Sequence, residues 1–342
     1  MTTDCARILL LADTHLGFDM PLRPRVDRRR RGPDFFDNYE RVLGGVSGHR
    51  VDLLVHGGDL LFRRKVPARL VQQAMIPLKR LADSGVPVYL VPGNHERSEI
   101  PYEMLALHPN IHVFDRPRTF VADVNGIRIA LGGFPYCRYG VQGQFPSLLT
   151  AAGFKEVEAD VRLLCVHQCF EGAAVGPSEY TFRYADDVVR IRDVPDDSAA
   201  VLSGHIHRHQ VLTTDLVGRE APAPVLYPGS IERTSFAELD EAKGYLVLEV
   251  APGGVPGGVL RSWEFHPLPV RPMLVRDLHV GSAESTDLER AIRDTVASVP
   301  EDAILRIRVH GPLGDRDRAV VAAANLRAMV PHTMNVEVRV QL

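Results

Sequence analysis

The sequence predicts an α/β protein with a smaller second domain, and two features of its apolar pattern support that fold class. Short apolar runs rich in β-branched residues end at or just before Gly, Asp, Asn or His, at residues 8–12, 53–56, 88–91, 127–131, 163–166 and 201–203. Helical patterns lie between several of them, near residues 35–43 and most clearly at 67–83. Alternating strand and helix signals favour buried strands, with functional groups at their carboxyl ends.

The later part of the chain is richer in strand signals and then changes character. Residues 225–227 and 244–250 predict strands, and the Gly- and Pro-rich stretch 251–258 predicts a hairpin loop. We place a domain boundary near residues 267–272, which gives domains at 1–268 and 269–342. The second domain is expected to be a small α+β cap of helix, strand, helix and strand, at residues 287–299, 304–309, 315–329 and 335–340.

Composition limits the class of protein. The 342 residues are 45% hydrophobic and 24% charged, which is ordinary for a globular protein. The formal net charge of −3 excludes a globally basic nucleic-acid-binding protein, and four cysteines do not make a disulfide-dense framework. No apolar run is long enough to span a bilayer, and the first residues lack the features of a signal peptide. We therefore expect a cytoplasmic protein without membrane attachment.

Five short polar motifs follow predicted strands and share one kind of chemistry. They are Asp13-Thr-His15, Gly57-Gly-Asp59, Gly93-Asn-His-Glu96, the isolated His167 and Gly204-His-Ile-His207. Their carboxylates, amide and imidazoles combine hard oxygen with borderline nitrogen donors, which suits Mn²⁺, Fe or Zn²⁺. In Asp-x-His and His-x-His the two side chains lie on the same side of an extended segment. Each motif alone is more often a turn or a core residue, but the ordered set predicts a metal centre.

A thiolate site is an alternative for one of these motifs. Cys165, His167 and Cys169 alternate on one face, which could suggest zinc bound by sulfur. A centre for hard metals does not need those sulfurs, and buried cysteine commonly serves as a small apolar residue. We therefore expect both cysteines to pack in the core.

The ordered motifs resemble the calcineurin-like metallophosphoesterase superfamily, whose pattern is D-x-H, GD, GNH(D/E), H and G-H-x-H. The resemblance implies a sandwich of two mixed β-sheets flanked by helices, and two metal ions that share Asp59. One ion would be held by Asp13, His15, Asp59 and His207, and the other by Asp59, Asn94, His167 and His205. The ions would activate a water for in-line attack on phosphorus. Mn²⁺ is the expected metal, with Fe, Zn²⁺ and Mg²⁺ as alternatives.

The same resemblance gives His95 a catalytic role. It would stabilise the transition state or protonate the leaving oxygen. A structural His95 that caps its own loop is the alternative.

Three further segments resemble SbcD-type double-strand-break repair nucleases, at residues 31–39, 227–236 and 265–273. The resemblance implies a DNA exo- or endonuclease with a DNA-binding cap. Within residues 227–236, Ser230, Arg233 and Thr234 would offer hydroxyls and a guanidinium to a DNA phosphate. An ordinary turn between two strands fits the same residue types.

Two clusters of basic residues are further candidates for DNA contacts. Arg28–Arg31, with Arg23 and Arg25 nearby, would follow a phosphate backbone or form a solvated loop. In the cap, Arg306, Arg308 and His310 alternate on one strand and would face DNA or solvent.

The chain departs from the SbcD-type pattern at two places. Phe62 stands where many of these nucleases carry His, and because Phe cannot donate a hydrogen bond it argues against efficient exonuclease action. Members that work with an SMC-like (SbcC-type) ATPase continue into a helix pair, whereas this chain stops at Leu342. A partner of this kind is therefore an open expectation. The resemblance also implies a homodimer formed through residues 35–46 and 67–83.

Two other functions fit the same motifs. A phosphodiesterase or phosphatase for nucleotides or other small phosphoesters would hydrolyse a small chromogenic diester and leave DNA intact. A DNA-end binding and tethering protein would keep its DNA affinity in Asp59→Asn and His95→Ala variants.

Overall fold

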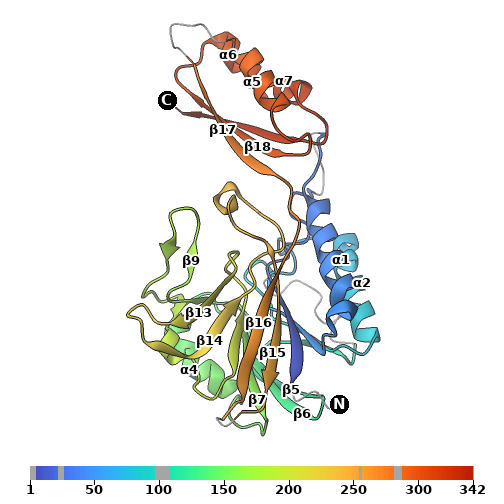
Figure 1. Ribbon diagram of the computed structural model, residues 1–342, viewed down its shortest axis with the longest axis vertical. Helices are drawn as coiled ribbons and strands as arrows, with labels where there is room; N and C mark the ends of the chain where they lie inside the picture. The colour runs from blue at the N-terminus through green and yellow to red at the C-terminus, as the bar shows by residue number, and fades with distance from the viewer. Residues whose placement is uncertain (1–4, 22–26, 97–107, 254–255, 281–286, 342) are drawn as a thin grey trace. The chain divides into compact units, whose positions relative to one another are not determined.

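The computed structural model in Figure 1 describes residues 5–21, 27–96, 108–253, 256–280 and 287–341. The chain forms two compact units. The first contains the residues up to Leu22 and Gly32–Pro269, and the second contains Val270–Leu342 with the described part of Arg23–Arg31. The early segment joins the second unit through its own hydrogen bonds. Arg29 donates to the Thr333 carbonyl at 3.2 Å, and Asn335 Nδ2 donates to the Arg29 carbonyl at 3.0 Å.

The first unit contains two six-stranded mixed sheets. One has the order β16-β15-β1-β2-β3-β4, in which β1 to β4 are parallel and β15 and β16 are antiparallel to their neighbours. Its strands are β1 (Ala6–Leu11), β2 (Leu53–His56), β3 (Val88–Leu90), β4 (Ile111–Val113), β15 (Gly244–Ala251) and β16 (Val259–Pro267). The antiparallel pairing of β15 with β16 agrees with a hairpin loop at residues 251–258.

The second sheet has the order β13-β14-β12-β7-β6-β5, with antiparallel strands only at its two edges. Its strands are β5 (Arg118–Val124), β6 (Ile127–Gly133), β7 (Val161–Val166), β12 (Ala200–Ser203), β13 (Gln210–Thr214) and β14 (Glu220–Tyr227). Short elements complete the unit: β8 (Cys169–Phe170), β9 (Ala174–Val175), β10 (Tyr180–Thr181), β11 (Val188–Val189), η1 (Ile191–Asp193) and η2 (Phe236–Glu238).

Side-chain alternation along the strands builds three apolar layers. In β1, Ile8 and Leu10 point between the two sheets, while Leu9 and Leu11 point to the opposite face. Helices α1 (Gly32–His49) and α2 (Ala68–Asp83) cover that opposite face, and α4 (Val141–Ala151) covers the outer face of the second sheet (Figure 1). The α/β class and the sandwich of two mixed sheets flanked by helices are confirmed.

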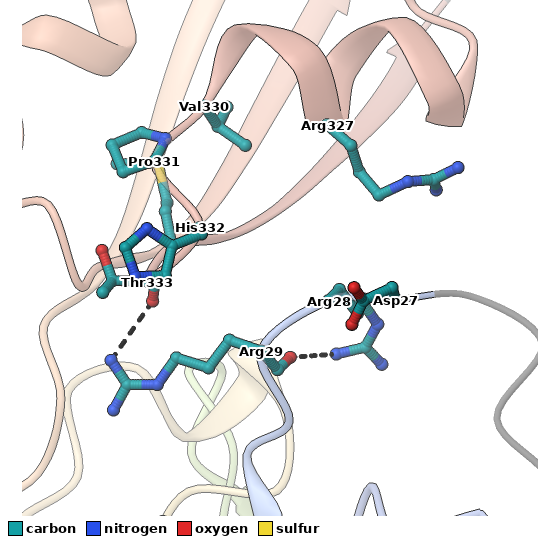
Figure 2. A pocket seen from close by; sticks show the side chains of 9 residues that line it. Asp27, Arg28, Arg29, Arg327, Val330, Pro331, His332 and Thr333 are labelled. Carbon is teal, nitrogen blue, oxygen red and sulfur yellow. Dashed lines mark hydrogen bonds between the residues drawn. The ribbon is translucent and has the colours of Figure 1, made fainter.

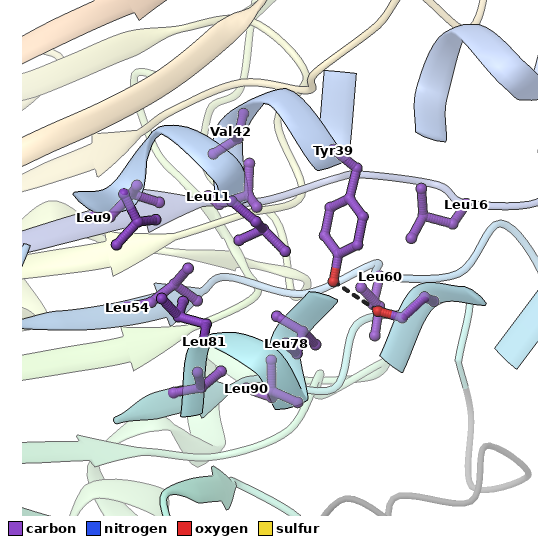
Figure 3. Packing of buried hydrophobic residues seen from close by; sticks show 14 of the residues in the cluster. Leu9, Leu11, Leu16, Tyr39, Val42, Leu54, Leu60, Leu78, Leu81 and Leu90 are labelled. Carbon is purple, nitrogen blue, oxygen red and sulfur yellow. Dashed lines mark hydrogen bonds between the residues drawn. The ribbon is translucent and has the colours of Figure 1, made fainter. Parts of the chain in front are cut away.

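The apolar faces of α1 and α2 pack within the protomer. Tyr39 and Val42 of α1 meet Leu78 and Leu81 of α2 over Leu54 of the sheet, as Figure 3 shows. The Tyr39 hydroxyl is buried there and donates to the Ala74 carbonyl at 2.9 Å. These faces are therefore already occupied, and the homodimer expected through the two helices stays a prediction.

The second unit is a parallel three-stranded sheet with helices. Strands β17 (Met273–His279), β18 (Ile304–His310) and β19 (Asn335–Gln341) lie in sequence order and are joined by α5 (Leu288–Ala297), α6 (Asp315–Val320) and α7 (Ala323–Met329). Ile307 and Val309 of β18 pack in its core with Ile292 of α5. No helix in the described part of the chain has the length and apolarity needed to span a bilayer.

The single helix predicted at residues 315–329 is wrong. Two short helices occupy this range, separated at Val321 and Ala322, where Ala322 adopts an extended ψ of 137°. The β-branched pair Val320–Val321 lowers the helix propensity at this point. The break also lets Leu326 of α7 enter the core, whereas α6 has no buried residue.

We predict that Tyr39→Phe lowers the free energy of unfolding by about 1 kcal/mol, because it removes one buried hydrogen bond without changing the packed ring. Urea denaturation measures this change. Tyr180→Phe is the matched control, since Tyr180 is 61% exposed and should leave stability unchanged. Equal stability of Tyr39→Phe and the wild-type protein would show that the hydrogen bond contributes nothing.

Candidate metal centre

The five motifs lie at the carboxyl ends of neighbouring strands in the two sheets. Asp13 follows β1, Asp59 follows β2 and Asn94 follows β3, while His167 follows β7 and His205 follows β12. Backbone hydrogen bonds continue past the strand ends and tie the first two loops together, from Asp13 N to Gly58 O (2.9 Å) and from His15 N to Asp59 O (3.0 Å). The edges where functional groups were expected are therefore where the motifs meet.

Four residues of this centre have a left-handed backbone. Asp13, His15, Asp59 and His205 have φ values of 50°, 42°, 53° and 87°. Non-glycine residues rarely adopt this region, and such backbone strain persists where the surrounding structure enforces it. Asp13 and His15 therefore do not lie on an extended segment, so the extended conformation predicted for Asp-x-His is wrong.

Two glycines leave the space that the centre needs. A Cβ on Gly58, which has φ of 110°, would lie 2.2 Å from His167 Nδ1. A Cβ on Gly93 would lie 2.1 Å from Asp59 Oδ1. Any larger residue at either position would displace one of the side chains that converge here.

One group of side chains gathers around His15. The Nε2 atoms of His15 and His207 lie 2.9 Å apart, so both rings point to the same place. Ligand atoms of Asp13, His15 and His207 lie within 4.8 Å of one another. Asp13 also accepts the His205 backbone N–H at 3.1 Å, which joins the first loop to the last motif.

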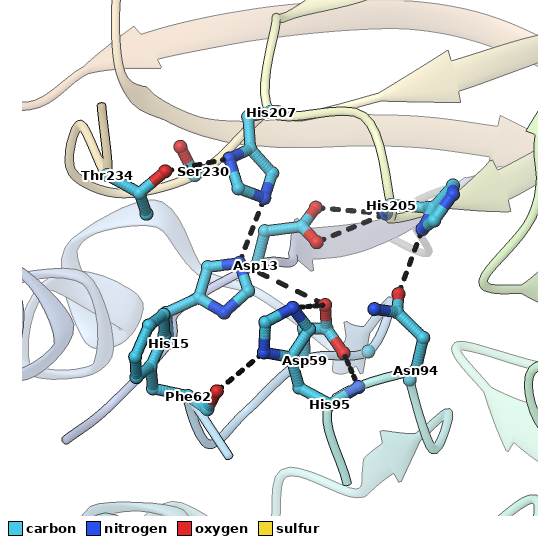
Figure 4. Close-up of polar contacts among 12 residues, drawn as sticks. Asp13, His15, Asp59, Phe62, Asn94, His95, His205, His207, Ser230 and Thr234 are labelled. Carbon is cyan, nitrogen blue, oxygen red and sulfur yellow. Dashed lines mark hydrogen bonds and ion pairs between the residues drawn. The ribbon is translucent and has the colours of Figure 1, made fainter. Parts of the chain in front are cut away.

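A second group gathers around Asn94. Asn94 Oδ1 lies 3.0 Å from His167 Nε2 and 3.0 Å from His205 Nδ1. Asp59 lies between the two groups, with Oδ2 3.5 Å from His167 Nε2 and 4.0 Å from His15 Nε2. Its other oxygen, Oδ1, accepts the His95 backbone N–H at 2.9 Å. Figure 4 shows the side chains of Asp59, Asn94 and His205 at this centre.

The donor set fits divalent cations. Carboxylate oxygen, amide oxygen and imidazole nitrogen are present without a thiolate, which suits Mn²⁺, Fe or Zn²⁺. Asp13, His15, Asp59 and His167 are buried, where unpaired charges are costly unless they are paired or hold a metal. Within the described residues, the buried His15 Nδ1 has no hydrogen-bond partner. His15 Nε2, not Nδ1, faces His207 and Asp59, so the donor set and not this orphaned atom supports a cation at the centre.

Burial and ion pairing set the charges of the metal-free centre. Burial alone would lower the pKa of His167, but Asp59 outweighs it and raises the pKa to about 9. Burial would likewise raise the pKa of Asp59, yet His167 holds it well below its usual range. Burial raises the pKa of Asp13. Burial, with the charge of His167, lowers the pKa of His205 to about 3. The metal-free centre is therefore built on an ionised Asp59–His167 pair.

His95 lies at the open edge of the centre. Its side chain is 35% exposed, and Nε2 is 3.9 Å from Asp59 Oδ2. Nδ1 lies 2.5 Å from the Phe62 backbone carbonyl, which can only accept, so Nδ1 carries the hydrogen. The Phe62 backbone thus orients His95, while the Phe62 ring packs against Phe18 at a centroid distance of 4.9 Å.

The residues predicted to contact DNA phosphate make bonds within their own loop. Ser230 is fully buried and donates to the Glu232 carbonyl at 2.9 Å, so its hydroxyl stabilises the loop and is not presented to a substrate. Arg233 donates to the Glu238 and Glu241 carbonyls, at 3.1 and 3.3 Å. The substrate contacts of Arg233 and Thr234 stay a prediction.

The structure describes part of the basic cluster at residues 23–31. Arg28 and Arg29 line a cavity of about 560 Å³ in the second unit with Asp27, Arg327 and His332, as Figure 2 shows. Arg23 and Arg25 lie outside the described residues.

The basic residues of β18 are paired within the second unit. Arg308 and His310 both bind Asp277, at 2.7 and 2.6 Å, and Arg306 binds Glu337. These basic side chains are therefore paired with carboxylates of their own sheet. Its contact with DNA stays a prediction.

Two buried residues support the centre in roles that the sequence analysis did not assign: Glu96, which ends the Gly93–Glu96 motif, and His56, which precedes Gly57. Buried Glu96 accepts the backbone N–H groups of Leu61 and Gly93, at 2.9 and 3.0 Å, and so ties two ligand loops together. Buried His56 accepts the Gly58 N–H at 3.3 Å and lies 3.1 Å from the Thr14 hydroxyl. These contacts join positions far apart in the sequence or use ring atoms whose direction the pattern does not give.

The two cysteines near His167 pack in the core. Cys165 lies in the layer between the sheets and Cys169 under α4. Burial raises the pKa of both thiols well above the ordinary value. The prediction of packing is confirmed, because both side chains are buried among apolar residues.

The fold agrees with comparisons to known proteins. Residues 6–209 match the family described as Calcineurin-like phosphoesterase. The chain is 25% identical over 311 residues to the DNA double-strand break repair protein Mre11 of Aeropyrum pernix, covering 86% of this chain and 69% of that one. It is 26% identical to Mre11 of Methanopyrus kandleri and 30% identical to Mre11 of Haloferax volcanii. These alignments cover 70% and 73% of this chain, and 51% and 50% of the two relatives.

The chain belongs to the calcineurin-like phosphoesterase family, whose match covers more than half of its length. It is a metal-dependent phosphoesterase, and its family uses two divalent metal ions. The Mre11 relatives are similar across most of this chain at modest identity. Because the chain spans 69% of one relative and about half of the other two, their full activities do not transfer with the similarity.

We predict that the metal-free protein loses stability as the pH rises from about 6.5 through about 9. The pKa of His167 lies above its ordinary value of 6.5 in the folded state, so the proton that it holds stabilises the fold. This contribution is fully present below pH 6.5 and disappears once His167 is deprotonated. Denaturant unfolding with chelator present, at several pH values, measures it.

Asp59→Asn is the matched variant for this experiment, because it removes the charge that raises the His167 pKa. The fall in stability over this pH range should be much smaller in the variant. An equal fall in both proteins would contradict the ion pair as its cause.

Proposed function

We propose that this chain is a two-metal DNA nuclease that processes DNA ends. The observation that carries the proposal is the convergence of the five motifs on Asp59, with His95 at the accessible edge.

The geometry supports two ion positions on either side of Asp59. One ion would be held by Asp13, His15, Asp59 and His207, since the Nε2 atoms of the two histidines already point to one place. The second would be held by Asp59, Asn94, His167 and His205, since both histidines lie 3.0 Å from Asn94 Oδ1 and Asp59 Oδ2 lies 3.5 Å from His167 Nε2. Mn²⁺ is the proposed metal, because the donors are oxygen and imidazole nitrogen, with Fe, Zn²⁺ and Mg²⁺ as alternatives.

The protein side chains supply orientation and a proton. Bound ions would provide an activated water and neutralise charge on the phosphoryl oxygens. The Gly57 carbonyl, 2.7 Å from His167 Nδ1, fixes that ring so that Nε2 faces the centre. His95 is held at Nδ1 by Phe62, so its Nε2 is the atom available to substrate. When doubly protonated, His95 would donate a proton from Nε2 to the leaving oxygen.

DNA is proposed as the substrate because the relatives found across most of the chain are named for DNA double-strand break repair. The cavity lined by Arg28, Arg29 and Arg327 adds guanidinium groups, which suit phosphate contacts. A cytoplasmic location, a homodimer and an SMC-like ATPase partner remain part of the proposal. Phe62 offers the substrate no hydrogen bond from its ring, so we expect endonuclease action to exceed exonuclease action.

We predict that the protein with Mn²⁺ cleaves end-labelled linear duplex or single-stranded DNA, and that His95→Ala lowers the rate by roughly 10²- to 10⁴-fold. His95 is not one of the proposed ligands, so the variant should still bind both ions. Gel analysis of labelled DNA and equilibrium dialysis of Mn²⁺ measure the two properties. His108→Ala is the control, since the His108 ring pairs with Asp83 at 2.9 Å on the surface.

Other outcomes select other functions. Hydrolysis of a small phosphodiester without cleavage of DNA would keep the metal centre and reject DNA as substrate. DNA affinity without cleavage, unchanged in Asp59→Asn and His95→Ala, would instead favour a tethering protein.

A further inference from the structure

A buried network of charges lies beside His207, in the segment first expected to hold a DNA phosphate. His207 uses its two ring nitrogens on different sides. Nε2 is 2.9 Å from His15 Nε2, toward the centre, whereas Nδ1 is 3.2 Å from Glu238 Oε1. Glu238 is itself buried. The same imidazole therefore connects the proposed metal position to a carboxylate behind it.

Lys243 holds that carboxylate in place. Its side chain is fully buried, and Nζ lies 2.6 Å from Glu238 Oε2 and 3.1 Å from Glu241 Oε2. Nζ also donates to the His207 backbone carbonyl at 2.9 Å. All three ammonium hydrogens thus have acceptors, so Lys243 serves this network and not a substrate phosphate.

Thr234 supplies the remaining donors to Glu238. Its hydroxyl lies 2.5 Å from Glu238 Oε1, and its backbone N–H is 3.3 Å from each carboxylate oxygen. The carboxylate is surrounded by donors from Thr234 and Lys243 and stays ionised beside the ammonium group. An ionised carboxylate only accepts, so His207 Nδ1 must carry the hydrogen.

We propose that Glu238, anchored by Lys243, is a positioning residue that fixes the ring orientation and the Nδ1–H tautomer of His207. This leaves the Nε2 lone pair free for a cation. The inference rests on the proposed function, because His207 is one of the proposed ligands. Carboxylates that orient a metal-binding histidine are conserved devices in metal sites, and their loss typically lowers metal affinity.

Glu238→Gln tests the tautomer directly. Lys243 would attract the amide oxygen of the new side chain, which turns the amide N–H groups toward His207. His207 Nδ1 would then accept, and the ring hydrogen would move to Nε2. Nitrogen-15 NMR of labelled histidine in the metal-free protein reports this change, with the His207 signals assigned from a His207→Ala spectrum. A network that only stabilises the loop would not move the hydrogen.

Mn²⁺ titration followed by electron paramagnetic resonance supplies the second measurement. Glu238→Gln should lower the affinity for one of the two Mn²⁺ ions on the order of 10- to 100-fold and leave the affinity for the other unchanged. Glu241→Gln is the matched control, because Glu241 is also buried and also binds Lys243, but its carboxylate pairs with Lys243 and Arg208 (3.2 Å) and not with His207. It should keep both affinities and the Nδ1–H tautomer.

The outcomes separate this inference from the proposed function. The inference would be overturned if Glu238→Gln kept the wild-type tautomer and the wild-type Mn²⁺ affinities. Equal losses of Mn²⁺ affinity in Glu238→Gln and Glu241→Gln would also overturn it. If the wild-type protein binds fewer than two Mn²⁺ ions, the proposed function fails, and the NMR result on the metal-free protein still decides the role of Glu238. If Glu238→Gln does not fold, Thr234→Val removes one donor to the same carboxylate, and an unchanged metal affinity there would overturn the inference.

Discussion

The carboxylate of Asp59 is the contact on which the arrangement of the centre depends. It lies between the groups gathered at His15 and at Asn94, and its ion pair with His167 joins loops from both sheets. Its position requires a left-handed backbone at Asp59 itself and no side chain at Gly93. The local strain is tolerated because the strands below it are locked in the apolar layers of the sandwich.

Much of this arrangement could be predicted from the sequence, because it follows from short-range rules. Apolar runs that end in polar motifs located the strands, and the carboxyl ends of neighbouring parallel strands had to bring the motifs together. The helical face at residues 67–83 was found for the same reason, and its Leu70, Ala74 and Leu78 are buried in α2. Apolar residues recur about every 3.6 positions in such a helix and every 2 positions in such a strand. This spacing is set locally, so it can be read from the sequence before the tertiary contacts are known.

What the sequence could not supply depends on contacts between distant residues. The motif around Glu96 does not show that its carboxylate accepts the Leu61 N–H. The residues around His56 likewise do not show its contact with the Thr14 hydroxyl. Ser230 was a reasonable phosphate ligand by residue type, yet its hydroxyl is buried and donates to the Glu232 carbonyl. The break between α6 and α7 depends on how Leu326 reaches the core, which periodicity alone does not specify. Residue chemistry was therefore predicted better than residue partners.

The early segment that belongs to the second unit limits how this protein can evolve by recombination. Because the described part of Arg23–Arg31 belongs with Val270–Leu342, the chain passes between units after Leu22, after Arg31 and after Pro269. The second unit is thus not a separable C-terminal segment, since one genetic crossover near Pro269 would separate Asn335 and Thr333 from Arg29. Exchange of this unit between relatives requires coordinated change at both places, so the two units are expected to diverge together.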